Sequence, residues 1–362
     1  MNFQLIIAAI VSFTIAAAVM PLIIKLAIKL KATDQPNHRK VHVKPMPRWG
    51  GLGIFIGVIA GYFASGLYEM HLNGIIIGAV IIIALGLIDD RFELSAKVKL
   101  VGQIIAAVVV ASTGLKMDLL TIPFIDTFHL DPWAAYIATI FWIIAITNAI
   151  NLIDGLDGLA AGVSVIVTIT IAIMAGVNGN MMILTLALIV AASTLGFLLF
   201  NFNPAKIFMG DAGSMFLGYS ISILSLLGLY KSVTLFSFVV PIIILGVPVF
   251  DTSFAIIRRM ANKKPISAPD KGHLHHRLIN LGMSHRKTVL VIYALSIIFS
   301  VAAIVFESST LWGSVVIIIG LLLMLEVIAE IIGLVHHRYR PVLYLYRKLF
   351  RTPTEMNSSD KK

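Results

Sequence analysis

The chain has 362 residues, of which 59% are hydrophobic and 13% are charged, and its mean hydropathy is +0.96. One soluble core could not bury so much apolar surface, so we expect an integral membrane protein. The chain has no cysteine, which excludes disulfide frameworks and thiolate metal sites. In a membrane protein the net charge of +10 indicates topology and attraction to anionic lipid or substrate, and no nucleic-acid partner is expected.

Apolar stretches separated by polar or turn-rich breaks follow one another along the chain. A bilayer core of about 30 Å takes roughly 20 helical residues. Eleven candidate spans emerge, at 3–24, 51–64, 75–88, 100–113, 133–150, 159–177, 181–200, 215–229, 235–257, 289–306 and 311–335. Pro241, Gly246 and Pro248 predict that the ninth helix is broken. We therefore expect an all-α polytopic protein with about 11 transmembrane helices, forming one domain over residues 1–351.

Basic residues are concentrated in one of the two sets of loops that these spans create. Of the 28 Lys and Arg residues, only Lys116 and Lys231 lie in the loops that follow even-numbered spans. The positive-inside rule therefore places the other loops and the carboxyl terminus in the cytosol and the amino terminus outside. The first span is followed, not preceded, by lysines, so it is predicted to be a retained helix. The tail 352–362 has the composition of a disordered segment.

Two adjacent acids follow the third span, and a lysine lies shortly after them. Asp89 and Asp90 would each raise the pKa of the other unless a cation or a basic group lay close, and Lys99 is a candidate for that group. The alternative is a solvated helix end with a charged cap. All the dense polar motifs fall in predicted cytosolic loops, and this coincidence indicates a single site.

Amide and acid side chains recur at three-residue spacing after the fifth span. Asn148, Asn151, Asp154 and Asp157 keep near one helical face until glycines release the backbone. Their oxygen atoms suit a hard divalent cation or a phosphate. The alternative is a set of polar residues that merely ends a helix.

Asp211 stands between glycines, ahead of the eighth span. Gly210 and Gly213 allow the backbone to approach a ligand closely, and Asp211 offers a hard oxygen. Asp211 or Ser214 could instead be a helix N-cap.

Histidines and an arginine cluster in the longest internal cytosolic loop. His273, His275, His276 and Arg277 lack the third ligand of a recognisable zinc pattern, and imidazole with guanidinium suits a diphosphate. Asp251 lies in the apolar ninth span, where an ionisable group is costly unless it faces protein or a watery cleft. We interpret it as lining the site, with a structural ion pair as the alternative.

Acids for a metal, bases for phosphates and an apolar scaffold together indicate phosphoryl transfer at a membrane surface. With these motifs in order, the chain resembles the polyprenyl-phosphate N-acetylhexosamine-1-phosphate transferases, a family that includes the peptidoglycan phospho-N-acetylmuramoyl-pentapeptide transferase. The resemblance covers almost the whole chain. It is carried by residues 44–51, Asp89-Asp90, residues 148–159, residues 208–214 and residues 272–277.

The resemblance implies roles for these residues. Asp211, Asn151 and Asp154 would bind Mg²⁺, or Mn²⁺ in its place. The residues that would neutralise phosphate oxygens are Lys44, Lys99, His273, His275, His276 and Arg277. Asn148 and Asp251 are expected, from their own positions in the sequence, to contribute to substrate binding. Phe208 would stack on uracil, while Asn201 and Asp157 would hold the uridine. Asp89 and Asp90 would position the acceptor or the metal. The family also implies a bacterial plasma-membrane location and a possible homodimer.

The donor is expected to be a simple UDP-N-acetylhexosamine. The muramoyl-pentapeptide enzymes resemble one another in a third histidine followed by acids, whereas this chain has Arg277 and Leu278 there. The segment 34–42 is similar to bacterial enzymes that place N-acetylglucosamine-1-phosphate on undecaprenyl phosphate to begin wall teichoic acid or another surface glycan. The muramoyl-pentapeptide transferase is kept as the alternative.

Two further alternatives concern mechanism and class. A phosphomonoester has a second pKa of about 6, so the lipid acceptor needs hardly any general base and direct displacement is expected. A nucleophilic aspartate is the competing mechanism. A secondary transporter would place polar residues near the bilayer midplane in inverted halves, and this sequence shows no duplicated half.

Overall fold

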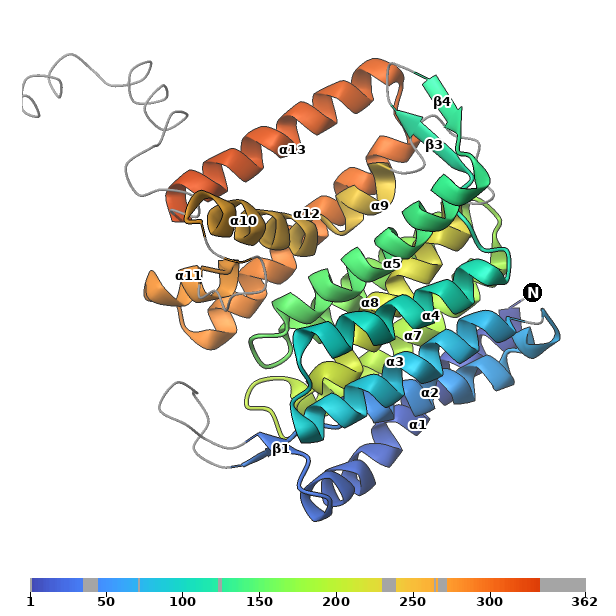
Figure 1. The fold of residues 1–362 in the computed structure, drawn as a ribbon, viewed down its shortest axis with the longest axis vertical. Helices are drawn as coiled ribbons and strands as arrows, with labels where there is room; N and C mark the ends of the chain where they lie inside the picture. Colours follow the sequence, from blue (N-terminus) through green and yellow to red (C-terminus); the bar gives the residue numbers. More distant parts are fainter. Residues whose placement is uncertain are drawn as a thin grey trace, which may run out of the picture.

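The computed structural model describes residues 2–34, 45–70, 72–122, 126–229, 239–263, 265 and 272–332. Within these residues the chain forms thirteen α-helices, one 3₁₀ helix and two small antiparallel sheets (Figure 1). The α-helices are α1 (Asn2–Lys29), α2 (Gly50–Ala64), α3 (Asn73–Phe92), α4 (Ala96–Ser112), α5 (Pro132–Ile153), α6 (Leu159–Val177), α7 (Met181–Asn201), α8 (Gly210–Leu229), α9 (Val239–Ile244), α10 (Gly246–Ala261), α11 (Leu274–Asn280), α12 (His285–Ser308) and α13 (Leu311–Ile332).

Within the described residues each of the eleven predicted spans overlaps helix, and the ninth is broken as predicted. Helix α9 ends at Ile244 and α10 begins at Gly246, and Pro248 falls in the first turn of α10, where a missing N–H is tolerated. Helices α1, α5, α6, α7, α12 and α13 are long and apolar enough to cross a membrane. The fold is that of a polytopic membrane protein. The tail 352–362 and Lys44 lie outside the described residues.

Short strands correct the prediction of a purely helical chain. Strand β1 (Thr33–Asp34) pairs with β2 (Met46–Pro47), and β3 (Leu119–Ile122) pairs with β4 (Asp126–His129). Both pairs lie in connections between helices, and pairs this short carry almost no period-two signal in the sequence. The 3₁₀ helix Leu67–Met70 and the short helix α11 are likewise connections that hydropathy could not locate.

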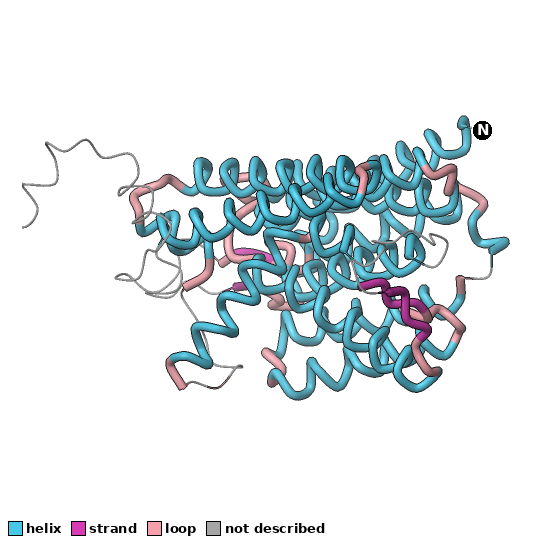
Figure 2. Tube along the Cα trace, turned by 90° about the horizontal axis from the view of Figure 1, so that it is seen from above, coloured by secondary structure: helices cyan, strands magenta, loops and turns pink. Residues whose placement is uncertain are grey.

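Helix α8 is the centre of the bundle. It contacts α2, α3, α5, α6 and α7, and its Tyr219 and Phe216 are almost completely buried. Figure 1 shows α1–α4 on one side of it and α12 and α13 on the other. Figure 2 shows the same helices from above, most of them running in roughly one direction. A residue at either end of α8 therefore meets several other helices.

Glycines bring α2 and α3 against the first turn of α8. A Cβ atom on Gly51 would lie 2.0 Å from the backbone nitrogen of Gly213, and one on Gly86 would lie 2.2 Å from the Cα of Ala212. Real Cβ atoms do not approach other atoms so closely, so only glycine fits at Gly51 and Gly86. This packing fixes the start of α8, where Asp211 lies.

Candidate active site

Asp90 joins the end of α3 to the beginning of α8. The Asp90 side chain is 5% exposed, and its two carboxylate oxygens accept hydrogen bonds from the backbone N–H groups of Asp211, at 2.8 Å, and Ala212, at 3.2 Å. These are N–H groups of the first turn of α8, which have no partner within the helix. A carboxylate is also favoured there by the helix dipole. Asp90 thus caps a helix that begins 120 residues later in the chain.

Lys99 links Asp89 to Asp211. Its Nζ donates to Oδ2 of Asp89 at 3.1 Å and to Oδ2 of Asp211 at 2.7 Å. The other oxygen of Asp89 accepts from the backbone N–H of Leu94 at 2.7 Å. Asp89 lies beyond the apolar stretch 75–88, and its burial, followed by its interaction with Asp211, raises its pKa to about 6 although Lys99 opposes the shift. The structure therefore brings together the predicted acid pair, the lysine and the acid of α8.

Asn151 and Asp154 approach the same place from the end of α5. Asn151 Nδ2 donates to the hydroxyl of Ser214 on α8 at 2.8 Å. Desolvation, and then the negative charges of Asp211 and Asp157, raise the pKa of Asp154 to about 7. Asp154 therefore lies within electrostatic reach of Asp211 and of Asp157.

The predicted metal ligands offer two carboxylates and an amide. Oxygen donors of this kind suit Mg²⁺ or Mn²⁺, and the repulsion between Asp154 and Asp211 is the kind that a divalent cation relieves. No group of three His, Asp or Glu side chains arranged to hold a metal occurs among the residues that the structure describes. In chemical type Asp211, Asn151 and Asp154 suit an oxygen-liganded cation, and their assignment as metal ligands stays a prediction.

Asn148 is tied to Gln103, a residue that sequence analysis missed. Asn148 Nδ2 donates to Gln103 Oε1 at 2.7 Å, and Gln103 Nε2 donates back to Asn148 Oδ1 at 3.4 Å. Gln103 is 2% exposed and lies one turn beyond Lys99 on α4, as Asn148 lies one turn before Asn151 on α5. The amide pair thus sets α4 against α5. The signal in the sequence was a lone amide within an otherwise apolar run.

Asn201 and Asp157 hold two loops together. Asn201 is 4% exposed; its side chain accepts from the backbone N–H of Gly158 and donates to the carbonyl of Ile207, both at 2.9 Å. Asp157 Oδ2 accepts from the side chain of Asn203 at 3.0 Å and from the backbone N–H of Ala205 at 3.1 Å. These bonds connect the α5–α6 loop to the α7–α8 loop, so both residues shape the site. Their contact with uridine stays a prediction.

Phe208 lies beside the start of α8. Its side chain is partly exposed, and its backbone donates to the carbonyl of Pro47 at 2.8 Å and accepts from the N–H of Gly50 at 3.1 Å. These bonds attach the α7–α8 loop to the segment that enters α2. The stacking of Phe208 on uracil stays a prediction.

Asp251 holds residues 272–277, called the histidine segment below, in place. One of its carboxylate oxygens lies 2.8 Å from Nδ1 of His273, and the other accepts from the backbone N–H of Leu274 at 2.7 Å. Asp251 is 2% exposed, so its side chain supports the segment from within the protein. This hydrogen bond gives Asp251 a structural role, as in the alternative that the sequence left open, and its place in the lining of the site stays a prediction.

His275 brings the histidine segment next to the acidic cluster, the group formed by Asp89, Asp90, Asp154 and Asp211. A Cβ atom on Gly155 would lie 2.2 Å from Nε2 of His275, so the imidazole packs directly against the residue that follows Asp154. Burial, followed by the charge of His276, lowers the pKa of His275 to about 3, which keeps this imidazole neutral. His276 and Arg277 are partly exposed on α11. The structure therefore places every described site residue in one connected region.

Comparisons with known proteins identify the family of the chain. The model of glycosyl transferase family 4 matches residues 72–229, from the beginning of α3 to the end of α8. A probable undecaprenyl-phosphate N-acetylglucosaminyl 1-phosphate transferase of Bacillus subtilis is 59% identical over 350 residues, which are 96% of this chain and 98% of that protein. The chain belongs to glycosyl transferase family 4. The resemblance inferred from the motifs is confirmed.

More distant members of family 4 match over most of their length as well. A decaprenyl-phosphate N-acetylglucosaminephosphotransferase of Mycobacterium leprae is 37% identical over 74% of this chain and 75% of that protein. An undecaprenyl-phosphate alpha-N-acetylglucosaminyl 1-phosphate transferase of Salmonella typhi is 29% identical over 74% of each chain. This family 4 protein is therefore a membrane-embedded transferase.

Proposed function

We propose that the enzyme transfers N-acetylglucosamine-1-phosphate from UDP-N-acetylglucosamine to undecaprenyl phosphate. The products are UMP and undecaprenyl-diphospho-N-acetylglucosamine, the first lipid-linked intermediate of wall teichoic acid or another surface glycan. The observation that carries the proposal is the junction of α3, α4 and α8, where Lys99 lies between Asp89 and Asp211 above a helix N-terminus. The named activities of the Bacillus, Mycobacterium and Salmonella relatives support the donor and the lipid class.

Asp211, Asn151 and Asp154 would hold Mg²⁺. When bound, the cation supplies charge neutralisation for the donor's diphosphate. Lys99 already lies 2.7 Å from Asp211, so its ammonium group is placed to approach a phosphate oxygen at the same site. His273, His276, Arg277 and Lys44 would contact the remaining phosphate oxygens.

The reaction is a direct displacement at phosphorus. A phosphate oxygen of the lipid attacks the β-phosphorus of the donor, the bond from that phosphorus to the bridging oxygen breaks, and UMP leaves with that oxygen. The acceptor is largely dianionic at neutral pH, since its second pKa is about 6. Both oxygens of Asp90 accept backbone hydrogen bonds, and both oxygens of Asp89 are also engaged. These bonds favour positioning roles over nucleophilic attack by either aspartate.

The site would face the cytosol, in an eleven-span topology with the amino terminus outside. The partition of Lys and Arg among the loops supports this orientation. The end of α3, the start of α4 and the loops before α6 and α8 also meet at one end of the bundle. A cytosolic site has direct access to a soluble UDP-sugar.

Release of UMP by the purified enzyme tests the proposal. Undecaprenyl phosphate and Mg²⁺ are supplied with either UDP-N-acetylglucosamine or the UDP-muramoyl-pentapeptide, and Asp211→Asn serves as the inactive control. We expect UMP from UDP-N-acetylglucosamine alone, dependent on lipid and on Mg²⁺. UMP from the pentapeptide donor alone would instead establish the muramoyl branch. UMP released without lipid, with a trapped phospho-sugar on the protein, would establish the aspartyl mechanism.

A further inference from the structure

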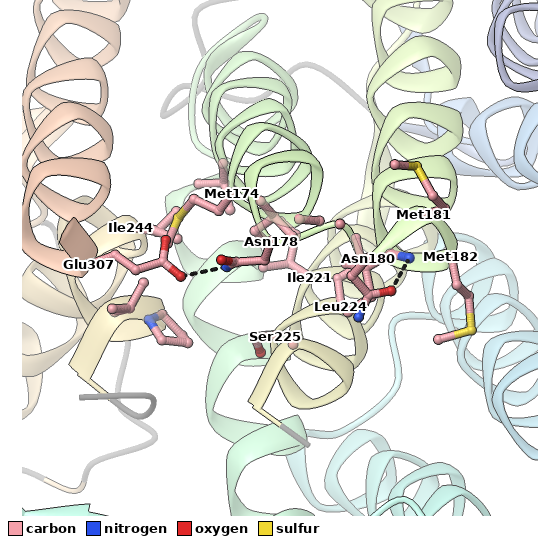
Figure 3. A pocket seen from close by; sticks show the side chains of 18 of the residues that line it. Met174, Asn178, Asn180, Met181, Met182, Ile221, Leu224, Ser225, Ile244 and Glu307 are labelled. Carbon is pink, nitrogen blue, oxygen red and sulfur yellow. Dashed lines mark hydrogen bonds between the residues drawn. The ribbon is translucent and has the colours of Figure 1, made fainter. Parts of the chain in front are cut away.

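A cavity of about 620 Å³ lies at the end of the bundle opposite the acidic cluster. Helices α6, α7, α8, α9 and α12 all contribute to its wall (Figure 3). Helix α8 connects the two regions, since it begins beside Asp211 and lines the cavity with Leu224 and Ser225. Ser225 is about 20 Å along the helix from Asp211, at 1.5 Å per residue. The cavity is thus separate from the proposed transfer site.

The cavity is polar at its rim and apolar within. At the rim, Asn178 donates to the carboxylate of Glu307 at 2.7 Å, and Figure 3 shows these two side chains pointing toward one another. From Asn178 the wall runs down α6 to Val167, a depth of about 16 Å at 1.5 Å per residue. Most of the interior residues are aliphatic side chains or methionines: Val167, Ile171, Met174, Ile221, Leu224 and Ile244.

Water does not suit this interior. A buried water needs two to four polar partners and takes about 30 Å³, so filling the cavity would need about 20 waters. Ser225 is the polar side chain deep in the wall, and it already accepts from Trp142 Nε1 at 2.9 Å and donates to the carbonyl of Ser222 at 2.7 Å. Three of the helices that line the cavity, α6, α7 and α12, are long and apolar enough to cross a membrane, so acyl chains are the apolar molecules available at this depth.

We propose that the cavity binds one acyl chain of a bilayer phospholipid, with its head group at the Asn178–Glu307 rim. The depth and the change from polar rim to apolar wall match a lipid of the leaflet opposite the acidic cluster. Methionines at Met70, Met174, Met181 and Met182 supply flexible side chains that adapt to a chain of variable conformation. The carboxylate of Glu307 favours a head group that carries an ammonium or hydroxyl donor, and it disfavours the dianionic head of a polyprenyl phosphate.

Fluorescence of Trp142 tests the proposal. Trp142 is 5% exposed and hydrogen-bonds to the cavity wall, so a brominated acyl chain in the cavity would quench it while chains of the surrounding bilayer would not. The protein for this experiment carries Phe at the other three tryptophan positions and is reconstituted with phospholipids brominated on the acyl chain. We expect a several-fold loss of Trp142 fluorescence relative to unbrominated lipid.

A cavity-filling variant provides the matched comparison. A Cβ atom on Gly228 would meet no atom within 4 Å, and Gly228 lines the cavity, so Gly228→Phe attaches a ring at the cavity wall without a clash at its Cβ. Gly320 on α13 has the same open space and lies away from the cavity, so Gly320→Phe is the control. Quenching should be lost in Gly228→Phe and kept in Gly320→Phe. Equal quenching in both variants, or none in the parent protein, would overturn the proposal.

Two further measurements keep the outcome decisive. Equimolar undecaprenyl phosphate should leave the quenching unchanged, and if it removed the quenching the occupant would be the acceptor chain and the phospholipid assignment would fall. In detergent, with all tryptophans native, added phospholipid should raise the Tm of the wild type and of Gly320→Phe but raise that of Gly228→Phe less. Equal rises in all three proteins would also contradict the proposal.

Discussion

The acidic cluster and the histidine segment are built in the same way. In each, a buried aspartate of one helix accepts backbone N–H from the first turn of a helix that comes later in the chain. Asp90 receives two backbone N–H groups of α8, whereas Asp251 receives one of α11 and uses its other oxygen for His273. Asp90 therefore positions only the backbone at the start of α8, whereas Asp251 positions the backbone at the start of α11 and the imidazole of His273.

The largest effect should follow from breaking the first of these contacts. Asp90→Ala would leave two N–H groups at the start of α8 without their partner, at about 1–3 kcal/mol for each buried donor. Asp211 would then move, and a displacement of about 1 Å costs on the order of 100-fold in rate. UMP release should fall by that factor. Asp131→Ala, at an exposed helix start without a side-chain cap, is the control, and equal activity of the two variants would refute the prediction.

Breaking the contacts of Asp251 should have a smaller effect, because an asparagine there would lose only one of its two contacts. Asp251→Asn retains an oxygen for the N–H of Leu274 but loses the carboxylate beside His273. We expect kcat/KM to fall about tenfold, the equivalent of about 1.4 kcal/mol. Combining Asp251→Asn with His273→Asn should add little to the loss from His273→Asn alone. Additive losses would mean that Asp251 acts independently of the imidazole.

A third prediction concerns the amide pair that sets α4 against α5. Gln103→Leu and Asn148→Leu should each destabilise the protein, and the double variant should show a coupling of about 0.6 kcal/mol, the average for such bonds between membrane helices. Unfolding in mixed micelles measures this value. The exchanged pair, Gln103→Asn with Asn148→Gln, should recover part of the loss. Zero coupling would remove the positioning role inferred for Gln103.

The smallest effect is a pH dependence of stability at Asp154. Its pKa is about 7 in the folded protein, above the ordinary value of 3.8, so the folded state favours the protonated carboxyl. The stabilisation from this group is fully present below pH 3.8 and is lost as the pH rises through 7. Without divalent cation, Asp154→Asn should raise Tm by about 2 °C at pH 8 and leave it unchanged near pH 4. An equal rise at both pH values would contradict this assignment.

Hydropathy predicted most of the fold because membrane spans leave a strong signal. Each of the eleven stretches contains helix within the residues that the structure describes, and the prolines located the break before Gly246. The extents were less accurate where polar residues continue a helix beyond the apolar stretch. Helix α3 runs on to Phe92 and α8 begins at Gly210, so Asp90 and Asp211 are both helical. Hydropathy marks the membrane boundary of a helix, and it says little about the turns outside it.

The site residues could be recognised by type, but their partners could not. Nothing in the sequence distinguishes Asp89 from Asp90, although the first pairs with Lys99 and the second caps α8. Asn148 belonged to a convincing polar series, yet its amide is bonded to Gln103. Such pairings depend on how helices far apart in the sequence are set side by side, which a single sequence does not contain.

The glycine contacts around the start of α8 limit how this enzyme can change. A single added carbon at Gly51 or Gly86 would collide with the backbone of α8. The helix junction beneath Asp211 therefore does not accept even a substitution to alanine at these two positions. Variation at the site is therefore confined to residues outside this junction. Tests of the proposed donor contacts should therefore substitute the partly exposed His276 and Arg277 and leave the helix junction untouched.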